Sequence, residues 1–180
     1  MEKKFILTDK FVINSFGIKL FQIKCTKSFK YAQKGDFGGY VEKEGNLDQE
    51  NDAWVSDNAR VSDNARVSGN ARVSDNARVS GNARVSGDAW VSGNAWVSGD
   101  ADIENDNEHC GFDGFGSCNR HTHAYMTKEK KVEIICGCFR GSIEEFEKKV
   151  EETYSGTVYE KQYKSIINVI KIKFGLTDFT

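Results

Sequence analysis

The fold is decided by residues 53–103, which read AWVSDN ARVSDN ARVSGN ARVSDN ARVSGN ARVSGD AWVSGN AWVSGD ADI. An alanine recurs every six residues from Ala53 to Ala101, and an aliphatic residue follows each alanine two positions later. A period of six fits neither a helical stripe nor a heptad, but it does fit a short strand followed by a sharp corner. The nine hexads therefore predict nine short strands joined by corners.

Within each strand, the alanine and the aliphatic residue lie two apart and point the same way, into a core. The residue between them and the serine that follows point outward. A glycine or aspartate, followed by asparagine or aspartate, then makes the corner, because glycine and asparagine best tolerate a left-handed backbone. Three strands and three corners close a triangular turn of 18 residues, so nine hexads predict about three turns.

This pattern resembles the hexapeptide-repeat left-handed parallel β-helix, with its aliphatic and small residues at the family's spacing. Serine stands where that family more often has Gly, Ala, Glu or Asp. The handedness is implied by the resemblance. The expected fold is therefore mainly β: a left-handed parallel β-helix of about three coils, a small N-terminal β cap, and a C-terminal hairpin with two helices.

Residues 18 apart are predicted to stack, about 4.8 Å from one another along the axis. The outward side chains then form three ladders: Trp54, Arg72 and Trp90 on face one; Arg60, Arg78 and Trp96 on face two; Arg66, Arg84 and Asp102 on face three. Arg72 between two tryptophans predicts a cation–π sandwich. Arg60 above Arg78 predicts repulsion unless an anion, or a corner carboxylate such as Asp57 or Asp75, lies nearby.

These ladders have two interpretations. In the first, the long side chains do no more than shield an exposed sheet face. Alternatively, they form a platform for an anion or nucleotide, because aromatic rings stack on bases while guanidinium groups bind phosphates. The candidate ligand-binding residues are Trp54, Arg60, Arg72, Arg78, Trp90 and Trp96.

We expect three segments along the chain. Residues 1–52 form a β cap with a motif that leads into the repeat, residues 53–104 form the repeat, and residues 105–180 form the C-terminal part. Strands are expected at 5–7, 11–13 and 19–23. Val41 and Leu47 are six residues apart, but Val55 is eight further on, which predicts an imperfect first turn with a two-residue insertion. The run from Gly35 to Val55 resembles a motif that precedes β-helix hexads in small phage and prophage proteins, and the resemblance extends to 116–120 and 136–141.

In the C-terminal part, residues 105–116 are polar and rich in glycine, and they are expected to form a loop. A hairpin is expected to turn over 128–131. Ser142 and Glu145 form the pattern of a capping box, which predicts a helix with an apolar stripe. A second helix is expected from about Thr157 to Phe174, ending at Gly175.

Cysteine and histidine gather after the repeat, and four of them are candidate zinc ligands: His121, His123, Cys136 and Cys138. Their one-residue gaps do not match the two-residue gap of common zinc fingers. The alternative is two buried strand cysteines and two exposed histidines. Five cysteines and no leader sequence suggest a reducing cytoplasm.

Composition excludes several classes of protein. With a net charge of -2, a general nucleic-acid coat is not expected. No apolar run is long enough for a membrane span. Residues 53–103 contain no histidine, which disfavours the acyltransferase activity found among hexapeptide-repeat proteins.

The leading hypothesis is a non-enzymatic binding protein of phage type, without a cofactor, acting as a homo-oligomer in the cytoplasm of an infected bacterium. It would sequester an anionic small molecule, such as a nucleotide signal of host defence. One alternative is a structural module whose coil is a rigid spacer and whose helices bind a host or virion protein. Another is a zinc-dependent enzyme.

Overall fold

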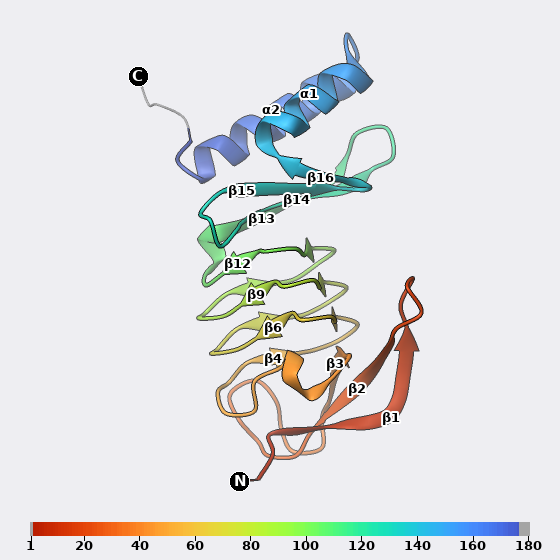
Figure 1. The fold of residues 1–180 in the computed structure, drawn as a ribbon, viewed down its shortest axis with the longest axis vertical. Coiled ribbons are helices and arrows are strands. Elements are labelled where there is room, and N and C mark those ends of the chain that lie inside the picture. Colours follow the sequence, from red (N-terminus) through yellow and green to blue (C-terminus); the bar gives the residue numbers. More distant parts are fainter. Residues whose placement is uncertain (1, 177–180) are drawn as a thin grey trace. The chain divides into compact units, whose positions relative to one another are not determined.

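The computed structural model describes residues 2–176, and the chain divides into two compact units, Met1–Asp106 and Asn107–Thr180. The first unit is a parallel β-helix whose turns stack along one axis (Figure 1). The second unit is a four-stranded sheet with two helices on one face.

The hexads form two-residue strands at the predicted positions. These are β4 (Trp54–Val55), β5 (Arg60–Val61), β6 (Arg66–Val67), β7 (Arg72–Val73), β8 (Arg78–Val79), β9 (Arg84–Val85), β10 (Trp90–Val91), β11 (Trp96–Val97) and β12 (Asp102–Ile103). Strands β4, β7 and β10 make face one, β5, β8 and β11 belong to face two, and β6, β9 and β12 make face three. The repeated alanines and aliphatic residues fill the interior, where none is more than 3% exposed. The parallel β-helix is confirmed.

The corners use the left-handed backbone at the first corner position, whether the residue is glycine or aspartate. Asp57, Asp63 and Asp75 adopt φ values of 55°, 59° and 59° there. Their carboxylates link successive corners: Asp63 Oδ2 accepts the Gly81 N–H at 3.0 Å, and Asp75 Oδ2 accepts the Gly93 N–H at 2.9 Å. These aspartates therefore support the corners along the axis.

The predicted two-residue insertion is confirmed by the register. Val41 pairs with Val61, and Leu47 bridges to Val67, both with an offset of 20 residues, whereas Val61 pairs with Val79 at the regular offset of 18. Strand β3 (Phe37–Val41) and Leu47 thus add a first turn below the hexads, with the 3-10 helix η1 (Glu44–Asn46) between them. The coil has about four turns, so the expected count of three is too low.

The N-terminal segment extends face two. Strand β1 (Phe5–Ile13) pairs with β2 (Lys19–Cys25), which pairs with β3, so that the sheet order is β1-β2-β3-β5-β8-β11. The two short strands expected at 5–7 and 11–13 are one strand, interrupted by a bulge between Leu7 and Phe11. Pairing with β2 on both sides of the bulge makes the strand continuous.

In the second unit, four antiparallel strands lie in chain order: β13 (His109–Phe115), β14 (Arg120–Met126), β15 (Val132–Cys136) and β16 (Phe139–Ser142). The hairpin over 128–131 is confirmed. The loop expected at 105–116 is wrong, because that segment holds the 3-10 helix η2 (Asp106–Glu108) and β13. Gly111, one of the glycines that made the segment resemble a loop, lies within the strand, where a β-carbon would lie 2.7 Å from His121 Cε1.

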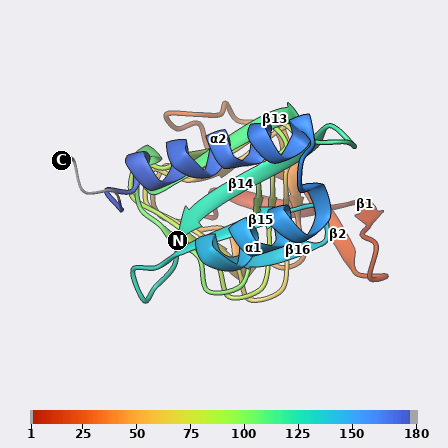
Figure 2. The same ribbon diagram turned by 90° about the horizontal axis from the view of Figure 1, so that it is seen from above.

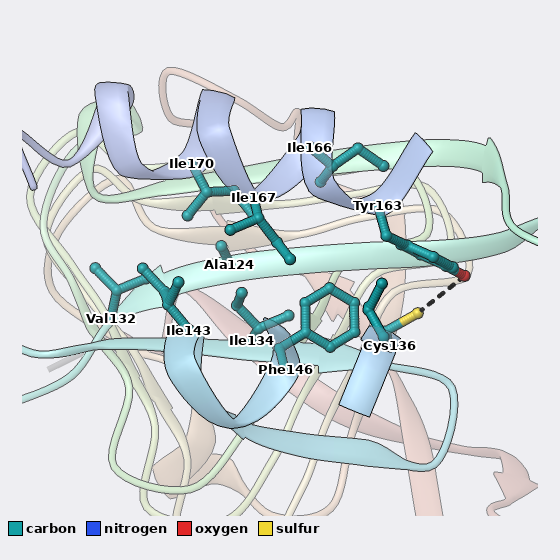
Figure 3. Close-up of a cluster of buried hydrophobic side chains, with 11 residues drawn as sticks. Ala124, Val132, Ile134, Cys136, Ile143, Phe146, Tyr163, Ile166, Ile167 and Ile170 are labelled. Atoms are coloured by element: carbon teal, nitrogen blue, oxygen red, sulfur yellow. Dashed lines mark hydrogen bonds between the residues drawn. The ribbon is translucent and has the colours of Figure 1, made fainter. Parts of the chain in front are cut away.

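Helices α1 (Ile143–Tyr154) and α2 (Val158–Lys173) lie across one face of this sheet (Figure 2). The capping box is confirmed: the Glu145 N–H donates to Ser142 Oγ, and the Ser142 N–H donates to the Glu145 carboxylate. Figure 3 shows the core between sheet and helices, which contains Ala124, Val132, Ile134, Cys136, Ile143, Phe146, Val150, Tyr163, Ile166, Ile167 and Ile170.

Candidate functional site

The register places the outward side chains in the predicted ladders. On face two, Arg60 is the Cα partner of Arg78, which is the partner of Trp96. On face one, Arg72 lies between Trp54 and Trp90 in register. On face three, the ladder runs from Arg66 through Arg84 to Asp102. The 18-residue period alone determines these neighbours.

A first cleft lies on face two, where the β1–β2 turn approaches the coil. Its volume is about 260 Å³, and it is lined by Asn14, Ser15, Phe16, Leu20, Arg60, Ser62, Asp63, Arg78, Val79, Ser80 and Trp96. The turn is held by Asn14, whose Oδ1 accepts the N–H groups of Phe16 and Ile18 at 2.9 Å each. Gly17, with φ of 79°, completes it. The turn therefore presents Phe16 from a fixed backbone.

Two positive charges in this cleft lack a balancing ion pair. Among residues 2–176, no ion pair joins Arg60 or Arg78 to a carboxylate. The carboxylate of Asp63 lines the cleft but accepts the Gly81 N–H. Of the two predicted ways to relieve the repulsion, the corner carboxylate is not seen: Asp57 and Asp75 accept backbone N–H groups along the axis. Stacked like charges next to an exposed indole favour an anionic ligand.

Face one differs from the prediction in one partner of its cation–π stack. The Arg72 guanidinium lies 4.3 Å from the Trp90 ring centroid, and its second aromatic partner is Tyr31, at 5.0 Å. The predicted sandwich between Trp54 and Trp90 is wrong. Trp54 is only 5% exposed and packs edge-on against Phe29, with centroids 5.4 Å apart. The loop between β2 and β3 supplies both Phe29 and Tyr31, and its position could not be inferred from the repeat.

A second cleft, of about 300 Å³, lies beside this stack. Its lining residues are Tyr31, Ala32, Asp36, Phe37, Trp54, Ser56 and Arg72. The six predicted ligand residues therefore do not form one platform. Arg60, Arg78 and Trp96 line the first cleft, Trp54 and Arg72 line the second, and Trp90 covers one face of Arg72.

Sequence reasoning missed Phe16, Tyr31 and Phe37 as cleft residues. The turn at 14–17 was predictable, but nothing in the sequence indicates that it approaches face two. No signal in the 26–36 loop assigns Tyr31 to Arg72.

The four candidate zinc ligands do not converge. Thr122 pairs with Cys136 in register, and both point toward the helices, where Thr122 Oγ1 donates to Cys136 Sγ at 3.3 Å. His121 and His123 alternate with Thr122, so they point to the other face of the sheet. Residue 138 lies in the exposed turn before β16. Within residues 2–176, no three His, Cys, Asp or Glu side chains are grouped to hold a metal ion.

The histidines have partners of their own. His121 Nδ1 lies 2.8 Å from Asp113 Oδ1, and His109 Nδ1 lies 3.1 Å from His123 Nε2. His123 is 1% exposed, so the alternative of exposed histidines is also wrong for this residue.

Comparison with known families identifies the repeat itself. The model for the YdcK beta solenoid repeat matches five overlapping windows: 53–69, 59–75, 65–81, 71–87 and 77–93. Residues 53–93 are therefore similar to this β-solenoid repeat, in agreement with the parallel β-helix of the structure. The matched β-solenoid windows contain Arg60, Arg72 and Arg78, whereas the loop and turn residues of both clefts lie outside them. No curated protein matches the chain. Between residues 2 and 176, no helix has the length and apolarity needed to span a membrane.

Proposed function

We propose that this protein is a binding protein that holds an anionic small molecule in the first cleft. The observation that carries the proposal is the stacked pair Arg60 and Arg78, which has no carboxylate ion-pair partner among the described residues. Two guanidinium groups on neighbouring strands bind a phosphate more strongly than either group alone, and a bound anion removes their mutual repulsion.

The rest of the cleft suits a nucleotide. Trp96, which is 37% exposed, and Phe16, which is 82% exposed, offer ring faces for a base. Ser62 and Ser80 add hydroxyl groups beside the arginines. The ligand class we infer is therefore an anion with a planar ring, of which a nucleotide is the simplest example.

The lining favours binding over chemistry. No histidine, cysteine or lysine is among the residues that line the first cleft. Among the described residues that line the cleft, Asp63 is the one acidic residue, and its carboxylate accepts a backbone N–H, which reduces its use as a general base.

The biological role we propose is sequestration of a nucleotide signal of host defence by a phage-type protein in the cytoplasm of an infected bacterium. The resemblance of residues 35–55 to phage and prophage proteins supports this context by analogy. We also propose a homo-oligomer, because β1 and the turn after it leave Phe11, Ile13 and Phe16 exposed by 42, 58 and 82%.

Two measurements test the proposed function. Mass spectrometry of small molecules released from purified protein should identify a phosphorylated, ring-bearing compound. Calorimetry with cyclic and linear nucleotides should then show micromolar binding that is lost in Arg78→Gln and retained in Arg84→Gln, the matched change on face three. If no nucleotide binds at micromolar concentration, or Arg78→Gln binds as the wild type does, the proposal is wrong.

One observation favours the alternative function, a module that binds a host or virion protein through its helices. Helix α2 leaves Val169 and Ile172, three residues apart on one stripe, exposed by 48 and 45%. Val169→Ser with Ile172→Ser should abolish recovery of such a protein from infected cells while leaving nucleotide binding unchanged. Retained recovery would contradict this alternative.

A further inference from the structure

The second cleft differs from the first in charge and in the way its arginine is held. We propose that it binds a small zwitterion, a primary amine that also carries a carboxylate and an apolar or aromatic side chain, as an amino acid does. The proposal uses Arg72 for the carboxylate, Asp36 for the amine, and the rings of Phe37 and Trp54 for the side chain.

Two aromatic rings already contact the Arg72 guanidinium. Its central carbon lies 5.0 Å from the Tyr31 ring centroid and 4.3 Å from the Trp90 ring centroid. The Trp90 ring is itself held, because its Nε1 donates to Ser74 Oγ at 3.0 Å. These rings compete with a ligand ring for the guanidinium faces, whereas a carboxylate fits its planar donor edge with two parallel hydrogen bonds. No ion pair satisfies that edge within residues 2–176.

Asp36 gives the cleft an opposite charge. Its Oδ2 accepts the Gln33 N–H at 2.8 Å, which orients the carboxylate and leaves further acceptor sites on its two oxygens. The lining thus contains one cation and one anion, whereas the first cleft contains two cations and one anion. Lys24 and Lys30 contact Phe37 and Tyr31 at 5.3 and 5.0 Å but do not line the cleft. A balanced cleft favours a zwitterion over a phosphate dianion.

The walls between the two charges are aromatic. Tyr31, Phe37 and Trp54 line the cleft, whose volume of about 300 Å³ accommodates a single amino acid. Aromatic rings attract an ammonium group through their faces and also cover an apolar side chain. The cleft therefore combines a carboxylate donor, an amine acceptor and an apolar wall.

This inference does not depend on the proposed function, because the second cleft lies on face one and shares no lining residue with the first. The two proposals can therefore fail separately. A variant that loses nucleotide binding at the first cleft should still bind a zwitterion at the second. A variant that loses zwitterion binding at the second cleft should still bind a nucleotide at the first.

Calorimetry with the full chain and four probes tests the proposal. The probes are L-phenylalanine, phenylacetate, which lacks the amine, phenethylamine, which lacks the carboxylate, and inorganic phosphate. We expect phenylalanine to bind about tenfold or more tightly than either half, since each half leaves one charged partner unpaired. In the Arg78→Gln variant, which lacks the arginine pair of the first cleft, phosphate should bind more weakly than phenylalanine. Equal binding of phenylacetate and phenylalanine, or tighter binding of phosphate in this variant, would overturn the zwitterion assignment.

Variants locate the site. Arg72→Lys keeps the charge but loses the planar fork, and Asp36→Asn keeps the acceptor for the Gln33 N–H but loses the charge. Each should weaken phenylalanine binding about tenfold or more. The control Arg84→Lys and the first-cleft variant Arg78→Gln should bind phenylalanine as the wild type does, and thermal unfolding checks that all four fold. Unchanged binding in Asp36→Asn, or loss in Arg78→Gln, would overturn the proposal.

Discussion

The ammonium of Lys4 lies 2.9 Å from the carbonyl oxygen of Ala53, although the two residues are 49 positions apart. In the coil, each strand donates its N–H groups to the carbonyls of the turn above, as Trp54 does to Ala71. On face one, where the sheet ends at β4, the carbonyls of the lowest strand consequently point toward the N-terminal end with no strand below them. Lys4 also donates to the Asn51 carbonyl, and it is only 5% exposed. A lysine thus closes the end of face one.

Side chains also cap the lower end of face three and the upper end of face one. Asn46 Nδ2 donates to the carbonyl of Ala65 at 2.8 Å on face three. At the upper end of face one, the Trp90 N–H donates to Asp106 Oδ1 at 2.7 Å. Side chains therefore replace the missing turn at both ends of the coil.

Lys4→Met should lower the free energy of unfolding by about 1–3 kcal/mol, because the buried carbonyl of Ala53 and the part-buried hydrogen bond to Asn51 lose their donor while the apolar stem is kept. Lys3→Met is the control: Lys3 forms an exposed ion pair with Glu44, and its loss should change stability by less than about 1 kcal/mol. Urea unfolding measures both. Equal effects of the two changes would show that Lys4 does not cap the coil.

The Lys4 contribution should depend on pH. Desolvation by burial outweighs the nearby Asp48 and Asp52 carboxylates and lowers the pKa of Lys4 from 10.5. The unfolded chain therefore binds this proton more tightly, so the stability contributed by Lys4 rises as pH increases from its folded pKa toward 10.5. The difference in unfolding free energy between wild type and Lys4→Met should grow over that window. A constant or shrinking difference would contradict the lowered pKa.

Two corner glycines with the same φ of 66° separate backbone strain from steric clash. A β-carbon at Gly81 would lie 2.8 Å from the Gly99 nitrogen in the turn above, whereas one at Gly93 meets nothing within 4 Å. Gly93→Ala should destabilise by about 1–2 kcal/mol from the left-handed backbone alone. Gly81→Ala should cost clearly more, because the corner above must also move. Thermal unfolding of both variants tests this order, and equal losses would refute it.

Inorganic phosphate should stabilise the chain through face two. Phosphate that binds between Arg60 and Arg78 favours the folded state, so the melting temperature should rise with phosphate concentration more than with chloride at equal ionic strength. The rise should shrink in Arg78→Gln. The rise should persist in Arg84→Gln, because Arg84 lies on face three, where its neighbour in the ladder is the acidic residue Asp102. Equal stabilisation by both salts would argue against an anion site at the arginine pair.

Cysteine labelling should report the packing of the second unit. Cys118 and Cys138 are exposed, Cys25 and Cys136 are buried, and burial raises the pKa of Cys110 to about 11. Because the thiolate is the reactive form, a disulfide reagent at pH 8 should modify two thiols rapidly in the native chain and all five in denaturant. Rapid reaction of a third thiol in the native protein would show that Cys25, Cys110 or Cys136 is more accessible than its burial indicates.

The sequence alone determined the coil and its ladders. A strand of the repeat pairs with the residue 18 positions later, so its neighbours follow from the period, and even the offset of 20 at Val41 and Val61 follows from a two-residue insertion. The capping box at Ser142 was predictable for a similar reason, because its partners lie three residues apart.

Only the tertiary structure decided where the non-repeating segments lie. It placed Tyr31 rather than Trp54 on Arg72, brought Phe16 to face two, formed β13 from a segment rich in glycine, and separated Cys136 from His123. Each of these positions depends on contacts between segments with no periodic relation, and many packings satisfy the same local sequence. The repeat determined on which face each arginine lies and which residues are its neighbours in the ladder. The loops packed against the coil determined which of these arginines line a cleft.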